Sequence, residues 1–140
     1  MTTSNPPDAN QVLNDRIVLI IEDDPVLLRT LGQAFQRAGC RVVGARDGEV
    51  GLAHFLERTP DLVVTDILMP RREGVETILA MKAAAPQVKI LAISGGGRLG
   101  AEEILGLALG LGADAILPKP FRSAELLAAA QRLLEQDGEE

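Results

Sequence analysis

The sequence predicts a doubly wound α/β domain, in which helices cover both faces of a parallel sheet. Short apolar runs alternate along the chain with longer segments whose apolar residues recur every three or four positions. The short runs are almost continuously apolar, which is typical of parallel strands buried on both faces. A length of 140 residues suits one domain, and apolar residues make up 46% but aromatic residues only 2%, so the core must be aliphatic.

The five expected strands are the apolar runs at residues 17–21, 41–45, 62–65, 89–93 and 115–117. A helical segment follows each of them, so consecutive strands can lie parallel only if each helix crosses over the sheet. Right-handed crossovers bring the carboxyl ends of all the strands to one edge, and ligands bind at that edge where the strand order reverses. Functional residues are therefore expected where strands end.

Five helices are expected between and after the strands, because the apolar residues there share one face. The first carries Leu27, Leu28, Leu31, Phe35 and Ala38, and it ends at Gly39. The stripes of the next three are Val50, Ala53 and Leu56; Val75, Ile78, Leu79 and Lys82; and Ile104, Leu105, Ala108 and Leu111. The fifth follows Ser123, a suitable N-cap, and carries Leu126, Leu127, Ala130, Leu133 and Leu134.

Composition and charge narrow the class of protein. Residues 1–14 and 137–140 read as tails around a domain at residues 15–136. No apolar run approaches the roughly 20 residues of a membrane span, and the N-terminus lacks the pattern of a secretory signal, so a cytoplasmic protein without membrane contact is expected. The net charge is -6, from 14 basic and 20 acidic residues, and binding to nucleic acid is not expected.

Acidic side chains follow the first and third strands. Asp24 precedes Pro25 and reads as a helix cap, whereas Glu22 and Asp23 leave a buried strand at the binding edge. Asp66 ends the third strand, and in the order 2-1-3-4-5 it would face them. Two charges about 4 Å apart repel by roughly 4 kcal/mol at an effective dielectric near 20, so a cation is needed there. Oxygen ligands alone indicate a hard cation such as Mg²⁺.

A hydroxyl side chain stands at the end of the fourth strand, and an amine side chain follows the fifth. Ser94 precedes three glycines, and Lys119 follows the fifth strand. A carboxylate nucleophile, a cation, a hydroxyl donor and an ammonium together predict phosphoryl transfer to an acyl phosphate.

These motifs resemble those of the receiver domain of two-component response regulators. The matching segments are LIIEDDP, VVTDILMP, AISG and LPKPF, and the resemblance covers residues 16–136. From Asp23 to Asp66 the spacing is 43 residues, from there to Ser94 it is 28, and from there to Lys119 it is 25. The resemblance implies a flavodoxin-like (βα)5 fold with the strand order 2-1-3-4-5.

The resemblance also implies a role for each residue of the site. Asp66 would accept a phosphoryl group from a histidine kinase or a histidine phosphotransfer protein. Mg²⁺ would be bound by Asp23, Asp66 and the backbone carbonyl of Leu68, with Glu22 acting mostly through water. Lys119 would pair with Asp66 and then with the phosphoryl group, and the bond before Pro120 is expected to be cis.

Because the chain stops soon after the fifth expected helix, near Glu135, we expect a single-domain response regulator, a signalling domain that catalyses only its own phosphorylation and dephosphorylation. Its output would require a downstream target protein, return of the phosphoryl group within a relay, or a homodimer through the fourth-helix to fifth-strand face. Three alternatives stay open: a receiver-like binding module that works without phosphate, a Mg²⁺-dependent phosphatase, and a flavin carrier.

Five residues qualify this interpretation. Ile116 stands where the family has an aromatic residue, so switching through an aromatic rotamer is in doubt. Leu68 and Gly96 offer no polar side chain to orient water, which predicts slow self-dephosphorylation. His54 reads as a surface or partly packed residue of the second helix. The single cysteine, Cys40, reads as a small buried hydrophobe.

Overall fold

The fold is known from a computed structural model that describes residues 12–67, 73–94, 106 and 109–137, without the side chains of residues 73, 74, 94, 136 and 137. Its strands are β1 (Ile17–Ile21), β2 (Arg41–Ala45), β3 (Leu62–Asp66), β4 (Lys89–Ser94) and β5 (Ala115–Pro118), and its helices are α2 (Pro25–Arg37), α3 (Gly48–Glu57), α4 (Glu73–Ala84) and α6 (Ser123–Asp137). Of the fourth predicted helix, only residues 106 and 109–111 lie within this description.

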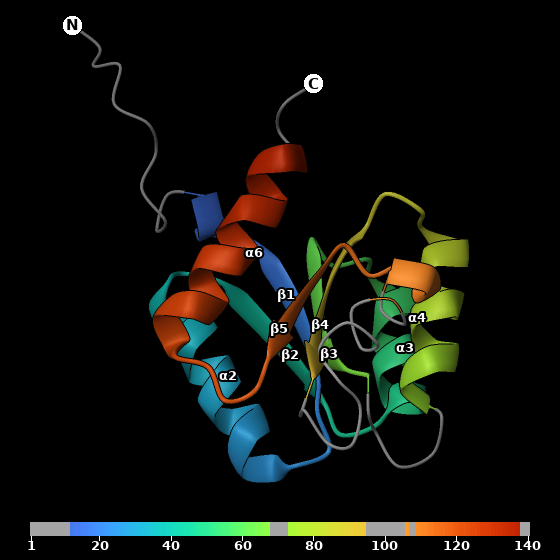
Figure 1. The fold of residues 1–140 in the computed structure, drawn as a ribbon, viewed down its shortest axis with the longest axis horizontal. Coiled ribbons are helices and arrows are strands. Elements are labelled where there is room, and N and C mark those ends of the chain that lie inside the picture. The colour runs from blue at the N-terminus through green and yellow to red at the C-terminus, as the bar shows by residue number, and fades with distance from the viewer. Residues whose placement is uncertain (1–11, 68–72, 95–105, 107–108, 138–140) are drawn as a thin grey trace, which may run out of the picture.

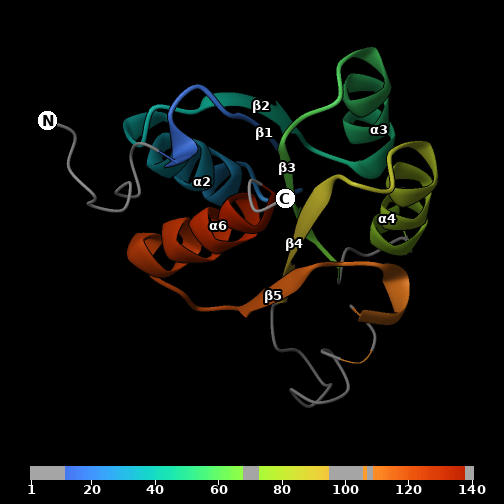
Figure 2. The same ribbon diagram turned by 90° about the horizontal axis from the view of Figure 1, so that it is seen from above.

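All five strands pair in parallel in the order β2-β1-β3-β4-β5, which confirms the predicted topology. Helices α2 and α6 cover one face of the sheet, and α3 and α4 cover the other (Figures 1 and 2). The central strand β3 is buried along its whole length, whereas the edge strand β5 is only partly buried.

Two aliphatic cores lie on either side of the sheet. On the first side, Leu31 and Phe35 of α2 pack with Leu126 and Leu133 of α6. On the second side, Phe55 of α3 and Ile78 and Met81 of α4 pack against the sheet. The whole cluster on this side is Leu19, Ile21, Ala45, Phe55, Val63, Ile67, Ile78, Met81, Ala85, Val88, Ile90, Ala92 and Ala113. Burial of these side chains fixes the sheet between its two helical layers.

The predicted buried face of α3 is wrong. Val50 and Leu56 are 42% and 64% exposed, and α3 instead buries Phe55 and two glycines. One of them, Gly51, lies so close to β1 that an added Cβ would stand 2.5 Å from Cδ1 of Ile21. Close approach of helix and strand, rather than an apolar stripe, therefore selects this face.

The predicted N-terminal boundary also needs correction. Leu13 is fully buried in the core on the side of α2 and α6, so the fold begins before residue 15. In α4, Leu79 was expected on the apolar stripe but is 50% exposed. At the other end, α6 runs to Asp137, one residue past the predicted domain boundary.

Two interpretations of single residues are confirmed. Cys40 is buried, and its thiol donates a hydrogen bond to the carbonyl of Leu13 at 3.3 Å. His54 is partly exposed, and its Nδ1 lies 3.9 Å from Oε1 of Glu57, as expected for a surface residue of α3. In the part of the chain that the structure describes, no helix is long and apolar enough to cross a membrane.

Candidate functional site

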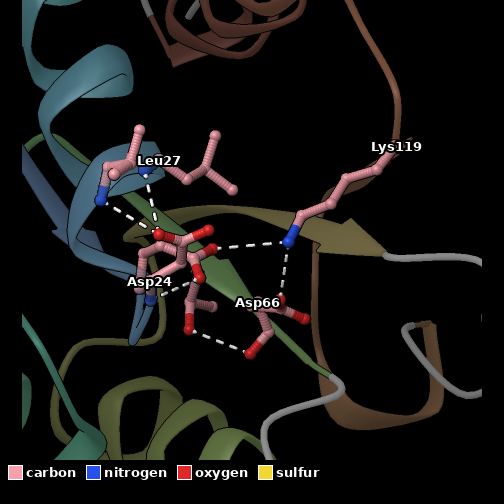
Figure 3. A network of polar contacts seen from close by, with 7 residues as sticks. Asp24, Leu27, Asp66 and Lys119 are labelled. Carbon is pink, nitrogen blue, oxygen red and sulfur yellow. Dashed lines mark hydrogen bonds and ion pairs between the residues drawn. The ribbon is translucent and has the colours of Figure 1, made fainter.

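The acidic run after β1 divides into a helix cap and a buried carboxylate. Asp24 accepts hydrogen bonds from the backbone N–H groups of Val26 at 2.9 Å and Leu27 at 3.4 Å, which caps α2 as the sequence predicted (Figure 3). The Asp24 carboxylate thus satisfies N–H groups that the first turn of the helix leaves unpaired.

Glu22 differs from Asp24 because its side chain is only 1% exposed. Its Oε2 accepts a hydrogen bond from the backbone N–H of Asp24 at 3.1 Å. Its Oε1 has no hydrogen-bond partner among the described residues and lies 3.5 Å from the ammonium of Lys119. A buried carboxylate is thereby held at the end of β1 with one oxygen directed to a cation.

Lys119 joins the ends of three strands. Its Nζ donates a hydrogen bond to Oδ2 of Asp66 at 2.9 Å, and Figure 3 shows its side chain reaching across from the end of β5 to this carboxylate. β1 and β3 are adjacent in the sheet, with Ile21 opposite Thr65, so Glu22 and Asp66 follow neighbouring positions. One ammonium therefore lies within ion-pair distance of both carboxylates.

The pKa values of two groups reflect this geometry. Burial raises the pKa of the Glu22 carboxyl above its ordinary value, and the neighbouring carboxyls of Asp23 and Asp66 add to the rise, although the Asp24 N–H and Lys119 oppose it. Burial alone would lower the pKa of the Lys119 ammonium. The hydrogen bond to Asp66, together with the charges of Asp66 and Glu22, outweighs burial and raises it.

The donor set at this edge suits a hard cation. It offers carboxylate oxygens with neither imidazole nor thiolate, and the buried Oε1 of Glu22 still lacks a hydrogen-bond donor among the described residues. Within those residues, no three acidic, histidine or cysteine side chains already surround a common metal position. Lys119 supplies the positive charge between Glu22 and Asp66.

The structure describes the other three predicted site residues to different extents. Asp23 is exposed at the same edge, directly after Glu22. Ser94 ends β4 opposite Pro118 of β5, so its backbone reaches the predicted edge, but its side chain lies outside the description. Leu68 lies outside the described residues. The peptide bond between Lys119 and Pro120 is cis, as expected.

Sequence reasoning missed an ion pair at the opposite end of β5. Nζ of Lys82, in α4, lies 2.9 Å from Oδ2 of Asp114, the residue just before β5. Asp114 stands five positions before Lys119, as Asp61 stands five positions before Asp66. That repeated spacing was a signal for Asp114, although it does not identify Lys82 as its partner.

The chain is similar to a well-populated class of signalling proteins. The model of the family described as response regulator receiver domain matches residues 18–131. Transcriptional regulatory protein CpxR of Escherichia coli K12 is 34% identical over 117 residues, which cover 84% of this chain and 48% of CpxR. Transcriptional regulatory protein PrrA of Mycobacterium tuberculosis is 35% identical over 121 residues, which cover 86% of this chain and 51% of PrrA.

The chain therefore spans about half the length of the curated relatives it matches. Among solved structures, a CheY-like response regulator receiver domain protein from Methanospirillum hungatei matches with a TM-score of 0.79 and 28% identity, over 91% of this chain and 100% of that one. A receiver domain protein from Clostridium thermocellum matches with a TM-score of 0.79 and 25% identity, over 88% and 97%. The residues that the family model matches include Glu22, Asp66 and Lys119.

Proposed function

Because the chain belongs to the family of response regulator receiver domains, we propose that it accepts a phosphoryl group on Asp66 in a Mg²⁺-dependent reaction. The donor would be the phosphohistidine of a histidine kinase or of a histidine phosphotransfer protein. The observation that carries this proposal is the position of Lys119 Nζ, 2.9 Å from Asp66 and 3.5 Å from Glu22. A carboxylate at a strand end beside a shared ammonium is suited to hold a transferred phosphoryl group.

In the proposed reaction, a carboxylate oxygen of Asp66 attacks phosphorus while the phosphorus–nitrogen bond of the donor breaks and the imidazole leaves. Asp23, Asp66 and the backbone carbonyl of Leu68 would hold Mg²⁺, with Glu22 acting through water. When bound, the ion neutralises charge on the phosphoryl oxygens. The buried Glu22 accepts a hydrogen bond from the backbone of Asp24, and Asp24 caps α2. These contacts keep the loop after β1 in place, so that the acidic ligands remain at this edge.

Lys119 and Ser94 act on the transferred group. Lys119 is 26% exposed in its side chain, so its ammonium can exchange its bond to Asp66 for one to a phosphoryl oxygen without leaving the site. Ser94 is the last residue of the neighbouring strand β4, and we assign its hydroxyl as a donor to another phosphoryl oxygen. Both hydrogen bonds stabilise the negative charge on the phosphoryl oxygens, which the Asp66 carboxylate alone would repel.

The test is phosphorylation by a small donor. The full chain is incubated with acetyl phosphate and Mg²⁺, and intact-mass spectrometry follows a gain of one phosphoryl group. We expect the gain in the native protein and not in Asp66→Asn, with Asp61→Asn, at the residue just before the same strand, as a matched control. A persistent gain in Asp66→Asn would place the acceptor elsewhere, and repeated turnover of the donor would instead indicate a phosphatase.

We further propose that phosphorylation is read by a protein surface. A hollow of about 490 Å³ lies between β5 and α6, lined by Ile116, Glu125, Ala128 and Arg132 among others. The fourth-helix to fifth-strand face shares β5 with this hollow, and we propose that it serves a downstream target or a homodimer. CpxR and PrrA are named as transcriptional regulators. The net charge of -6 favours output from this domain through protein contacts rather than its own contact with DNA.

The alternative of a receiver-like module that works without phosphate draws on Ile116. This half-buried aliphatic residue of β5 stands where the family has an aromatic one. The same assay separates the two functions, because a module of that kind would show no mass gain with Mg²⁺ and acetyl phosphate.

A further inference from the structure

The residue before β5 extends the pairing between β4 and β5 by one step. The backbone N–H of Asp114 donates to the carbonyl of Ile90 at 2.8 Å, and Oδ2 of Asp114 accepts from the N–H of Ile90 at 2.8 Å. A carboxylate thus takes the place that a backbone carbonyl would have in a longer strand. This contact can form only when β5 has its observed register on β4.

Lys82 locks the same carboxylate to α4. Its Nζ donates to Oδ2 of Asp114 at 2.9 Å and to the carbonyl of Val88 at 2.7 Å. The turn before Asp114 accommodates the stem of this lysine, because a Cβ added at Gly112 would stand 3.2 Å from its Cγ. Gly112 has φ +101°, so a side chain there would also be strained. The ion pair therefore connects α4, the turn at Gly112 and the start of β5. Figure 2 shows α4 beside the start of β5.

The strand that follows is short and has a paired neighbour on one side only. β5 has four residues, lies at the edge of the sheet and is nowhere fully buried. Its last residue, Pro118, has no N–H to donate to the ladder. Its side chains pack on both cores, Ala115 and Leu117 on one side and Ile116 on the other, but its backbone pairs with β4 alone. The two hydrogen bonds of Asp114 therefore lengthen the pairing that fixes the register of β5 on β4.

Register matters here because Lys119 directly follows β5. A slip of one residue moves a strand by about 3.3 Å. Such a shift would displace Lys119 relative to Asp66, whose Oδ2 now lies 2.9 Å from the lysine Nζ, by more than the length of that hydrogen bond. We propose that Lys82 and Asp114 are positioning residues for phosphoryl transfer, forming a register clamp that places Lys119 against Asp66 from the far end of β5. This role rests on the proposed function of the site.

β3 carries a similar device that serves as an internal control. The N–H of Asp61 donates to the carbonyl of Ile17 at 2.9 Å, and Oδ2 of Asp61 accepts from the N–H of Ile17 at 2.8 Å. β3, however, is fully buried and pairs on both sides, with β1 and with β4. Loss of the Asp61 contact should lower stability and leave the register of β3 unchanged.

The first experiment measures phosphorylation kinetics with acetyl phosphate and Mg²⁺, at a temperature where circular dichroism shows every variant folded. We expect Asp114→Ala and Lys82→Met to lower the rate at saturating donor about tenfold or more, with the half-saturating donor concentration little changed. Asp61→Ala should lower it less than about twofold. Lys82→Arg should restore most of the rate, and Asp114→Asn, which keeps an acceptor for Ile90, should be less impaired than Asp114→Ala.

The second experiment needs no phosphorylation. The energetic coupling of Lys119 to Asp66 is measured from the stabilities of Lys119→Met, Asp66→Asn and the double variant. It should fall to less than about half when Asp114→Ala is added, and persist when Asp61→Ala is added. Equal rate losses in the Asp61 and Asp114 variants, or an unchanged coupling with Asp114→Ala, would overturn the clamp. A native protein that takes up no phosphoryl group would refute the proposed function, while the coupling would still test the clamp.

Discussion

Removing the ammonium of Lys119 should destabilise the protein strongly in metal-free buffer. Lys119→Met leaves Glu22, 1% exposed, and Asp66, 10% exposed in its side chain, without the cation that faces both. At an effective dielectric near 20, the gross attractions at 2.9 Å and 3.5 Å are about 6 and 5 kcal/mol. Desolvation offsets part of these energies, and we expect a net loss of about 3–5 kcal/mol in the free energy of unfolding.

Urea unfolding followed by far-UV circular dichroism measures this loss, because the chain has no Trp or Tyr to report by fluorescence. Lys89→Met is the matched control. Lys89 begins β4, and its side chain makes no hydrogen bond or ion pair among the described residues, so its replacement should change stability by less than about 0.5 kcal/mol.

A double-mutant cycle then separates charge from packing. Once Asp66→Asn has removed one of the two carboxylates, Lys119→Met should cost at least about 2 kcal/mol less than it does in the native protein. Additive effects within about 0.5 kcal/mol would refute the reasoning, because they would mean that Lys119 stabilises the fold through its aliphatic stem rather than its charge.

Three further outcomes follow from the structure. Since burial, its largest cause, raises the pKa of Glu22, the folded state holds this proton more tightly than the unfolded state, so metal-free stability should fall as pH rises above 4.5. Glu22→Gln should flatten that fall in urea unfolding, and parallel curves would contradict it. Gly51→Ala should destabilise by about 1–3 kcal/mol through Ile21, whereas Gly32→Ala, whose added Cβ would lie 3.6 Å from its nearest neighbour, should be neutral or stabilising by up to about 1 kcal/mol in the same assay. Burial raises the pKa of Cys40 to about 11 from 9.0, so iodoacetamide at mildly alkaline pH should label the native protein at least about a hundredfold more slowly than the unfolded chain, and comparable rates would show the thiol to be accessible.

The sheet was predictable from the sequence because its strands are short, apolar and separated by helical periods. The observed β1 and β2 have the predicted bounds, and the other three strands are each one residue longer. Their added residues, Asp66, Ser94 and Pro118, are polar or lack an N–H, so hydrophobicity ended each expected strand too early. Backbone pairing with the neighbouring strand extends them.

The juxtaposition of Glu22, Asp66 and Lys119 was also predictable, because parallel strands bring their carboxyl ends to one edge. The buried face of α3 was not, since it depends on a glycine that lets the helix approach β1. The ion pair of Lys82 with Asp114 was missed for a different reason. A lysine on an apparent helical stripe and an aspartate before a strand are each ordinary, and only the fold brings them together.

The two principal groups of the site are thus held in different ways. Asp66 ends a central strand that is buried throughout and paired on both sides, so the acceptor is fixed by the core itself. Lys119 follows a short edge strand that pairs with one neighbour, and its side chain retains 26% exposure. The proposed reaction needs this asymmetry, because the acceptor carboxylate must stay in place while the ammonium exchanges one oxygen partner for another. A lysine directly after an edge strand can exchange its oxygen partner, provided that a separate contact keeps the strand in register. We assign that contact to Lys82 and Asp114.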